Sequence, residues 1–263
     1  MSIAIITGAS GGIGKEFAKG LFRSYGVKDF WFVARNEKKL LALIEEMKEI
    51  SDDFSARIIP LDLSSDEGID ELCRIVEDEK PKIKYLINSA GFGKFGRFDE
   101  ISSTDVRNMI NLNDKALVLI THACIPYMER GGRIVELGSG SCFTPLPNFN
   151  VYAASKSFVL HYTKALNFEF RKYGVRATCF CPGWVETEFF DTAIESGVSM
   201  PKKNKIKPLL NAEKVTRGCL KAVAKGKAMY VTGYYTKLQH VLFKLVPDPI
   251  LTRIWLGMQN RKN

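Results

Sequence analysis

The chain has 263 residues, of which 46% are apolar and 25% charged, and its formal net charge is +9. This balance is typical of a globular protein with a large buried core. The longest apolar run without a charged residue, 116–128, is shorter than the roughly 20 residues that span a bilayer, and the apolar start at 3–6 is too short for a secretory signal. We therefore expect no transmembrane segment and a cytoplasmic protein.

Part of the positive charge is local, in a lysine cluster at 202–207 and a basic end at 253–262. No nucleic-acid-binding motif accompanies it, so we expect no nucleic-acid partner. A solvated basic face is the simplest interpretation, and attraction to an anionic substrate, a carrier protein or a membrane surface is the alternative. The cysteines and histidines show no metal-ligand spacing, so we expect reduced thiols and no metal site.

Strand-like apolar runs alternate with segments of helical period along most of the chain. We expect strands at 3–7, 30–34, 56–61, 85–88, 133–137 and 176–181. Helices are expected at 13–23, 37–49 and 66–77, and two long ones at about 102–129 and 150–173. This alternation predicts an α/β fold of one domain, 1–263: a doubly wound, Rossmann-type parallel sheet in three α/β/α layers.

Two regions break the alternation. Residues 191–210 contain glycine, two prolines and the lysine cluster, and we interpret them as a lid over a substrate site. The C-terminal tail, 234–263, carries two apolar patterns of helical spacing separated by Pro247 and Pro249. These patterns predict two helices that cover the core or a subunit interface, with membrane contact or a pocket wall as alternatives.

A glycine-rich turn joins the first expected strand to the first helix. Gly8, Gly12 and Gly14 recur there at fixed offsets. Lacking Cβ atoms, they permit a tight turn and close approach of the backbone to a pyrophosphate. The following helix N-terminus offers free N–H groups and a positive partial charge to that anion. The turn therefore indicates a dinucleotide site.

Further motifs follow in order, and together they resemble the short-chain dehydrogenase/reductase family in its single-domain form. They are Asn-Ser-Ala-Gly at 88–91, Asn113 in 111–113, Ser139, Tyr152 with Lys156, and Pro182-Gly183 followed by Thr187. Ser89 departs mildly from the family's second asparagine. The resemblance covers residues 1–235, and it implies an enzyme that transfers a hydride between a nicotinamide cofactor and a carbonyl or alcohol.

The resemblance also implies which residues act. The catalytic set would be Asn113, Ser139, Tyr152 and Lys156. The cofactor-binding set would be Gly8, Ser10, Gly12, Ile13, Gly14, Arg35, Asp62, Leu63, Asn88, Ala90, Gly91, Tyr152, Lys156, Pro182, Gly183, Val185 and Thr187. In the family the lysine also holds the nicotinamide ribose, and the asparagine supports a water through which the lysine exchanges protons.

Tyr152 and Lys156 are four residues apart on an expected helix and so share a face. An ammonium beside a phenol favours the phenolate, so we expect Lys156 to lower the pKa of Tyr152. Ser139 follows a strand, where its hydroxyl can hydrogen-bond a substrate oxygen. Ser141 competes with Ser139, and Asn111 with Asn113, as alternative assignments.

The cofactor type is indicated by the end of the second strand. Arg35 stands there without an acidic residue, and a guanidinium suits the 2′-phosphate of NADP(H). The alternative is an NAD enzyme with an exposed arginine. Asp62 resembles the family residue beside the adenine ring.

The expected substrate pocket is apolar and aromatic, which suits a bulky lipophilic ketone or alcohol such as a hydroxysteroid or 3-oxoacyl compound. The substrate-binding set would be Ser139, Phe143, Tyr152, Trp184 and Phe189, with Cys142, Leu146, Phe149 and Phe190 nearby. A non-catalytic NADPH-binding sensor on the same fold is the main alternative function, and an extended-type sugar-nucleotide epimerase a weaker one. The resemblance implies a homodimer or homotetramer built on the two long helices.

Overall fold

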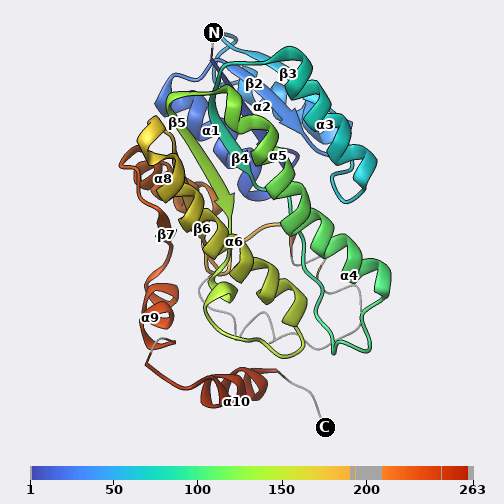
Figure 1. The fold of residues 1–263 in the computed structure, drawn as a ribbon, viewed down its shortest axis with the longest axis vertical. Coiled ribbons are helices and arrows are strands. Elements are labelled where there is room, and N and C mark those ends of the chain that lie inside the picture. Colours follow the sequence, from blue (N-terminus) through green and yellow to red (C-terminus); the bar gives the residue numbers. More distant parts are fainter. Residues whose placement is uncertain (1, 190–192, 194–208, 244, 260–263) are drawn as a thin grey trace.

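Seven parallel strands form one sheet in the order β3-β2-β1-β4-β5-β6-β7 in the computed structural model (Figure 1). The structure describes residues 2–189, 193, 209–243 and 245–259. The strands are β1 (Ile3–Thr7), β2 (Asp29–Val33), β3 (Ser55–Ile59), β4 (Ile83–Asn88), β5 (Met128–Leu137), β6 (Arg176–Cys181) and β7 (Met229–Val231). The order reverses between β1 and β4, so the loops after these strands diverge and leave a crevice.

Helices cover both faces of the sheet. One face packs against α1 (Gly12–Tyr25), α2 (Glu37–Lys48) and α8 (Ala212–Ala224). The other packs against α3 (Asp66–Glu79), α5 (Ala116–Cys124) and α6 (Asn150–Phe170). Because side chains alternate along a strand, the neighbours Ile5 and Ile6 of β1 enter the two different cores. The predicted three-layer, doubly wound fold is confirmed.

The prediction of one long helix at 102–129 is wrong in detail, because the segment is divided into three parts. It consists of α4 (Ser103–Ile110), a five-residue π-helix at Asn111–Lys115, and α5. It also ends early, because Met128 already pairs with Ile83 as the first residue of β5. Apolar periodicity did not reveal the π-helix, because five residues are too few to show a change of period.

The prediction also missed β7 and α8. Three residues are too few to show an alternating pattern in β7, and its place at the sheet edge comes from pairing with β6. Helix α8 packs across the sheet face against α1, with Cys219 and Leu220 buried. Both elements complete the sheet and helix layer beyond β6.

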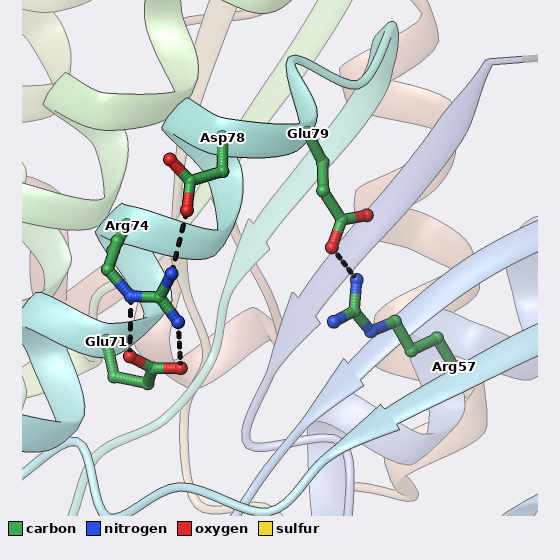
Figure 2. Close-up of polar contacts among 5 residues, drawn as sticks. All are labelled: Arg57, Glu71, Arg74, Asp78 and Glu79. Carbon is green, nitrogen blue, oxygen red and sulfur yellow. Dashed lines mark hydrogen bonds and ion pairs between the residues drawn. The ribbon is translucent and has the colours of Figure 1, made fainter.

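Several ion pairs lie on the surface around α3 (Figure 2). Arg74 pairs with Glu71 and Asp78 within the helix, with nitrogen–oxygen distances of 2.8 Å and 2.7 Å. Arg57 of β3 pairs with Glu79 at the end of α3. These groups are largely exposed, so solvent screens them and each pair contributes little to stability.

The tail contains α9 (Tyr234–Leu242) and α10 (Asp248–Met258), at the end of the molecule toward which β5 points (Figure 1). Helix α10 buries Leu251 and Trp255, and Trp255 Nε1 donates a 2.8 Å hydrogen bond to the carbonyl oxygen of Pro147. In α9, by contrast, the apolar stripe through Leu238 and Val241 is exposed. Of the two expected roles, covering the core is therefore wrong for α9, whereas covering a subunit interface stays a prediction. Most of the expected lid, 191–210, lies outside the described residues.

Candidate active site

The glycine-rich turn has no room for side chains at two positions. Gly8 has a φ of +67°, and a Cβ there would lie 2.8 Å from the backbone nitrogen of Ala90. A Cβ on Gly14 would lie 2.3 Å from the carbonyl oxygen of Gly8. Helix α1 begins directly at Gly12, with no side chain capping its first turn. Its free N–H groups are therefore available to an anion such as a pyrophosphate.

A cavity of about 1040 Å³ opens at the carboxyl ends of the strands, beside the point where the strand order reverses. Many of the predicted site residues line it. They are Gly8, Ser10, Gly12, Ile13, Gly14, Arg35, Asp62, Leu63, Ala90, Gly91, Ser139, Tyr152, Pro182, Gly183, Trp184, Val185, Thr187 and Phe189. The glycine cradle, the free helix end and this volume fit a dinucleotide.

Helix α6 brings Tyr152 and Lys156 together, as their spacing predicts. The Lys156 Nζ atom lies 5.6 Å from the centre of the Tyr152 ring. The Tyr152 side chain is hydrogen-bonded to Ser139, which lies just after β5 and whose Oγ also accepts from the backbone nitrogen of Ser141. The competing Ser141 also lines the cavity, but its buried Oγ has no hydrogen-bond partner among the described residues. The geometry therefore favours Ser139.

Asn113 occupies the middle of the π-helix and is fully buried. Its Nδ2 donates to the carbonyl oxygen of Phe92 at 2.9 Å, and its Oδ1 accepts from the Phe92 backbone nitrogen at 3.1 Å. A Cβ on Gly91 would lie 2.9 Å from Asn113 Oδ1 and 3.3 Å from Lys156 Nζ, so the two side chains meet over this glycine. The competing Asn111 donates instead to the carbonyl oxygen of Ser64.

The expected direction of the Tyr152 pKa is wrong for this structure. Burial raises the pKa of Tyr152, and the hydrogen bond with Ser139 only partly opposes it. Burial also lowers the pKa of Lys156, whose Nζ donates to the carbonyl oxygen of Leu137 at 2.7 Å. The sequence spacing shows that the ammonium is near the phenol, but the cost of burying a phenolate depends on the packing around it.

Some predicted residues do not reach the cavity surface. Asn113 and Lys156 lie directly behind it, whereas Asn88 turns into the core toward Thr121. Cys142 is buried and does not line the cavity. Phe143 does not line it either, and its ring packs on His240 with a centroid distance of 4.2 Å. Phe190 lies outside the described residues.

Arg35 lies at the edge of the cavity, where its side chain is 71% exposed and 3.9 Å from the Asp62 carboxylate. Lys39, one turn into α2, also lines the cavity and was missed by the sequence reasoning. Its Nζ lies 2.6 Å from the carboxylate of Glu188. The available signal was its place in the first turn of the helix that follows Arg35.

The other end of the cavity is aromatic and apolar. Phe149 lies between Phe95 and Tyr152, with centroid distances of 3.8 Å and 4.4 Å. The Phe189 ring lies 5.4 Å from that of Tyr152. The tail supplies further lining residues, most of them from its two predicted apolar patterns: Leu242, Phe243, Val246, Leu251, Ile254, Trp255 and Met258. The tail thus forms part of the pocket wall, and α10 also packs on the core through Trp255.

A doubly wound sheet with this glycine turn, and with a serine, tyrosine, lysine and asparagine gathered beside it, defines the class of Rossmann-type oxidoreductases. Within that class, the family model for short chain dehydrogenases matches residues 2–196. The chain belongs to the short-chain dehydrogenase family. The resemblance seen in the sequence is confirmed.

Curated relatives agree with this assignment. The chain is 30% identical over 187 residues to an uncharacterized oxidoreductase of Staphylococcus epidermidis, covering 70% of this chain and 78% of that protein. It is 31% identical over 199 residues to sulfoacetaldehyde reductase 2 of Chromohalobacter salexigens, covering 74% of this chain and 76% of that protein.

Solved structures share the fold. A short-chain dehydrogenase from Sphingobium yanoikuyae in complex with NADPH has a TM-score of 0.79 at 24% identity, covering 100% of this chain and 97% of that one. A 7β-hydroxysteroid dehydrogenase has a TM-score of 0.80 at 20% identity, with coverages of 97% and 96%. A short-chain dehydrogenase/reductase from Burkholderia phymatum in complex with NAD has a TM-score of 0.76 at 22% identity, with coverages of 93% and 94%.

Proposed function

We propose that this protein is an NADP(H)-dependent carbonyl reductase or alcohol dehydrogenase. The observation that carries the proposal is the Tyr152 phenol, which lines the cavity, is hydrogen-bonded to Ser139 and has Lys156 one helical turn behind it. When bound, the nicotinamide cofactor donates or accepts the hydride. In reduction Tyr152 gives its proton to the substrate oxygen, and in oxidation it takes that proton back.

The surrounding residues position this proton transfer. Ser139 hydrogen-bonds the substrate oxygen as negative charge develops there. Lys156 stabilises the phenolate left on Tyr152, which matters because burial otherwise disfavours that charge. Asn113 holds the backbone at Phe92 and meets Lys156 over Gly91. Asn113 thereby fixes the backbone at Gly91 and Phe92, beside Lys156.

Two cations at the cavity edge support NADP(H) as the cofactor. Arg35 and Lys39 both line the cavity beside the α2 N-terminus, where a 2′-phosphate is stabilised by charge-assisted hydrogen bonds. The nearest carboxylate to Arg35, Asp62, is 3.9 Å away, too far for a hydrogen bond that would occupy the guanidinium. The structural neighbours bind either form, NADPH in one and NAD in another.

For the substrate we propose a bulky lipophilic ketone or secondary alcohol, such as a hydroxysteroid or a 3-oxoacyl compound. The support is the apolar half of the cavity, formed by Phe149, Trp184 and Phe189 together with the tail residues Leu251 and Trp255. The fold neighbour that is a 7β-hydroxysteroid dehydrogenase is in keeping with this class.

A substrate panel tests the proposal. Hydroxysteroids, 3-oxoacyl thioesters, aryl ketones and small sugars would each be assayed with NADPH and with NADH by the change in nicotinamide absorbance. We expect turnover of the bulky apolar carbonyls, with the higher kcat/KM for NADPH. Turnover confined to small polar sugars would overturn the substrate class, and equal or better use of NADH would overturn the cofactor assignment.

We also propose a homodimer or homotetramer built on α4–α5 and α6. These helices carry exposed aromatic and aliphatic side chains, of which Phe158 is 47% and Phe168 77% exposed. Light scattering of the purified protein measures the state, and a concentration-independent monomer would contradict the proposal.

A further inference from the structure

A carboxyl group lies buried behind the catalytic lysine. Glu136 of β5 is fully buried, and it directly precedes Leu137, whose carbonyl oxygen accepts the hydrogen bond from Lys156. Because side chains alternate along the strand, Glu136 shares with Ile134 the sheet face covered by α5 and α6. The carboxyl therefore lies between the sheet and the helix that carries Tyr152 and Lys156.

Polar side chains from two elements hold this carboxyl, and one from a third element supports them. Thr121 of α5 donates to Glu136 Oε1 at 2.9 Å. Asn88, at the end of β4, donates from Nδ2 to Thr121 Oγ1 at 2.9 Å and to Glu136 Oε1 at 3.4 Å. Tyr162 of α6 is hydrogen-bonded to Thr121. Glu136 Oε2, also buried, has no hydrogen-bond partner among the described residues.

A carboxylate is costly in such a place, because within the described part of the chain no cation pairs with it and one oxygen lacks a donor. Burial raises the pKa of Glu136 to about 8, against the opposing effects of Thr121, Asn88 and the Lys156 charge. Glu136 is thus mostly neutral at neutral pH and becomes charged just above it. In return, its negative charge raises the pKa of Lys156, against the burial that lowers it.

We propose that Glu136 is a positioning residue that acts through Lys156: it supplies a buried negative charge at alkaline pH and so keeps Lys156 in its ammonium form there. The inference rests on the proposed function, since it concerns the same lysine. It adds a buried carboxyl behind the site whose negative charge raises the pKa of Lys156.

The other titratable groups nearby do not duplicate this role. Cys124 of α5 and Tyr162 interact with Glu136, and burial raises the pKa of both. Three further groups face Lys156: Asp114 of the π-helix, Cys142, and Cys179 of β6. Asp114 is only partly buried and its pKa is raised to about 6, so it is already charged at neutral pH. Of the described carboxyls that interact with Lys156, Glu136 is the one whose charge changes above neutrality.

The test uses Glu136→Gln, which preserves the size of the side chain and the oxygen that accepts from Thr121. We expect kcat at neutral pH to stay within about twofold of wild type, because Glu136 is mostly uncharged there. Above pH 8 the activity of the variant should fall at a lower pH than that of wild type, because Lys156 loses its proton earlier. Asp114→Asn is the matched control, and its effect should already be present at neutral pH.

Two measurements keep this test independent of the proposed substrate. The pH dependence of NADPH affinity should show the same shift of the alkaline limb. Infrared titration of the intact protein should show a protonated-carboxyl band that is lost near pH 8 in wild type and is absent in Glu136→Gln. If no substrate of the panel is turned over, the proposed function fails while these two measurements still decide the inference. The inference about Glu136 would be overturned by superimposable pH profiles of wild type and Glu136→Gln, or by the absence of a carboxyl that titrates near pH 8.

Discussion

At the scale of single residues, Tyr152 shows two opposing effects. Lys156 lies close enough to stabilise a phenolate, whereas burial of the Tyr152 ring favours the neutral phenol. In the described structure burial is the larger effect. Tyr152 is therefore a neutral phenol in this structure, the form that its proposed role as proton donor in carbonyl reduction requires.

Removing the phenol should abolish the chemistry and leave the cavity intact. For Tyr152→Phe we expect kcat to fall by about 10²-fold to 10⁴-fold, the usual contribution of a positioned acid–base group. The NADPH dissociation constant, measured by fluorescence titration, should change little. A variant that keeps wild-type turnover would exclude Tyr152 as the proton donor. No turnover by the wild-type protein would instead favour a non-catalytic NADPH-binding sensor.

Arg35 should decide the preference between the two cofactors. Arg35→Asp removes a cation and adds a carboxylate where the 2′-phosphate would lie, so kcat/KM for NADPH should fall at least about tenfold. The value for NADH should hold or rise, because the new carboxylate can accept from a ribose hydroxyl. Arg217→Ala, an exposed arginine on α8, is the control. Equal losses with both cofactors would argue against a phosphate site.

At the scale of elements, strands and helices with clear periodicity were predictable and irregular ones were not. The bounds of β1 and β6 match the prediction, because their buried apolar runs end at glycine or proline. The π-helix was not predictable, although the motif within it was. Asn113, in the middle of the π-helix, is held by hydrogen bonds to the backbone of Phe92, in the loop after β4.

The tail helix α10 should control substrate binding more than cofactor binding. Trp255 anchors α10 through its hydrogen bond to Pro147 and lines the cavity beside Leu251. Trp255→Ala should raise KM for bulky substrates about tenfold or more, and change KM for NADPH less than twofold, because the pocket loses a large apolar wall.

Trp255→Phe separates the two contributions of this side chain, since it keeps a ring but loses the hydrogen bond. We expect it to give an intermediate KM for the bulky substrate. If both variants bind that substrate as wild type does, then α10 is not part of the substrate site.

At the scale of the whole molecule, the buried carboxyls couple folding to pH. The pKa of Asp114 is raised to about 6 and that of Glu136 to about 8, whereas both groups are ordinary acids in the unfolded chain. A raised folded-state pKa means that the folded state binds more protons. The stability these groups contribute is present at low pH and is lost as pH rises through the folded-state values.

Thermal unfolding should show this coupling. Because Glu136→Gln removes one such group, its Tm relative to wild type should rise as pH increases from about 5 to 8 and then level off. The comparison is made between two chains at each pH, so the titrations of other groups largely cancel. A Tm difference that does not vary with pH would show that Glu136 is not protonated in the folded protein.

Local patterns were enough to establish the order of the elements, the glycine turn, the Tyr152–Lys156 pair and the family, because each depends on neighbours within a few residues of the chain. Packing alone established the rest. It turned Asn88 and Phe143 away from the cavity, brought Lys39 and the tail to its wall, and buried Glu136 behind Lys156. Burial and pKa depend on segments far apart in sequence, so no local pattern contains them.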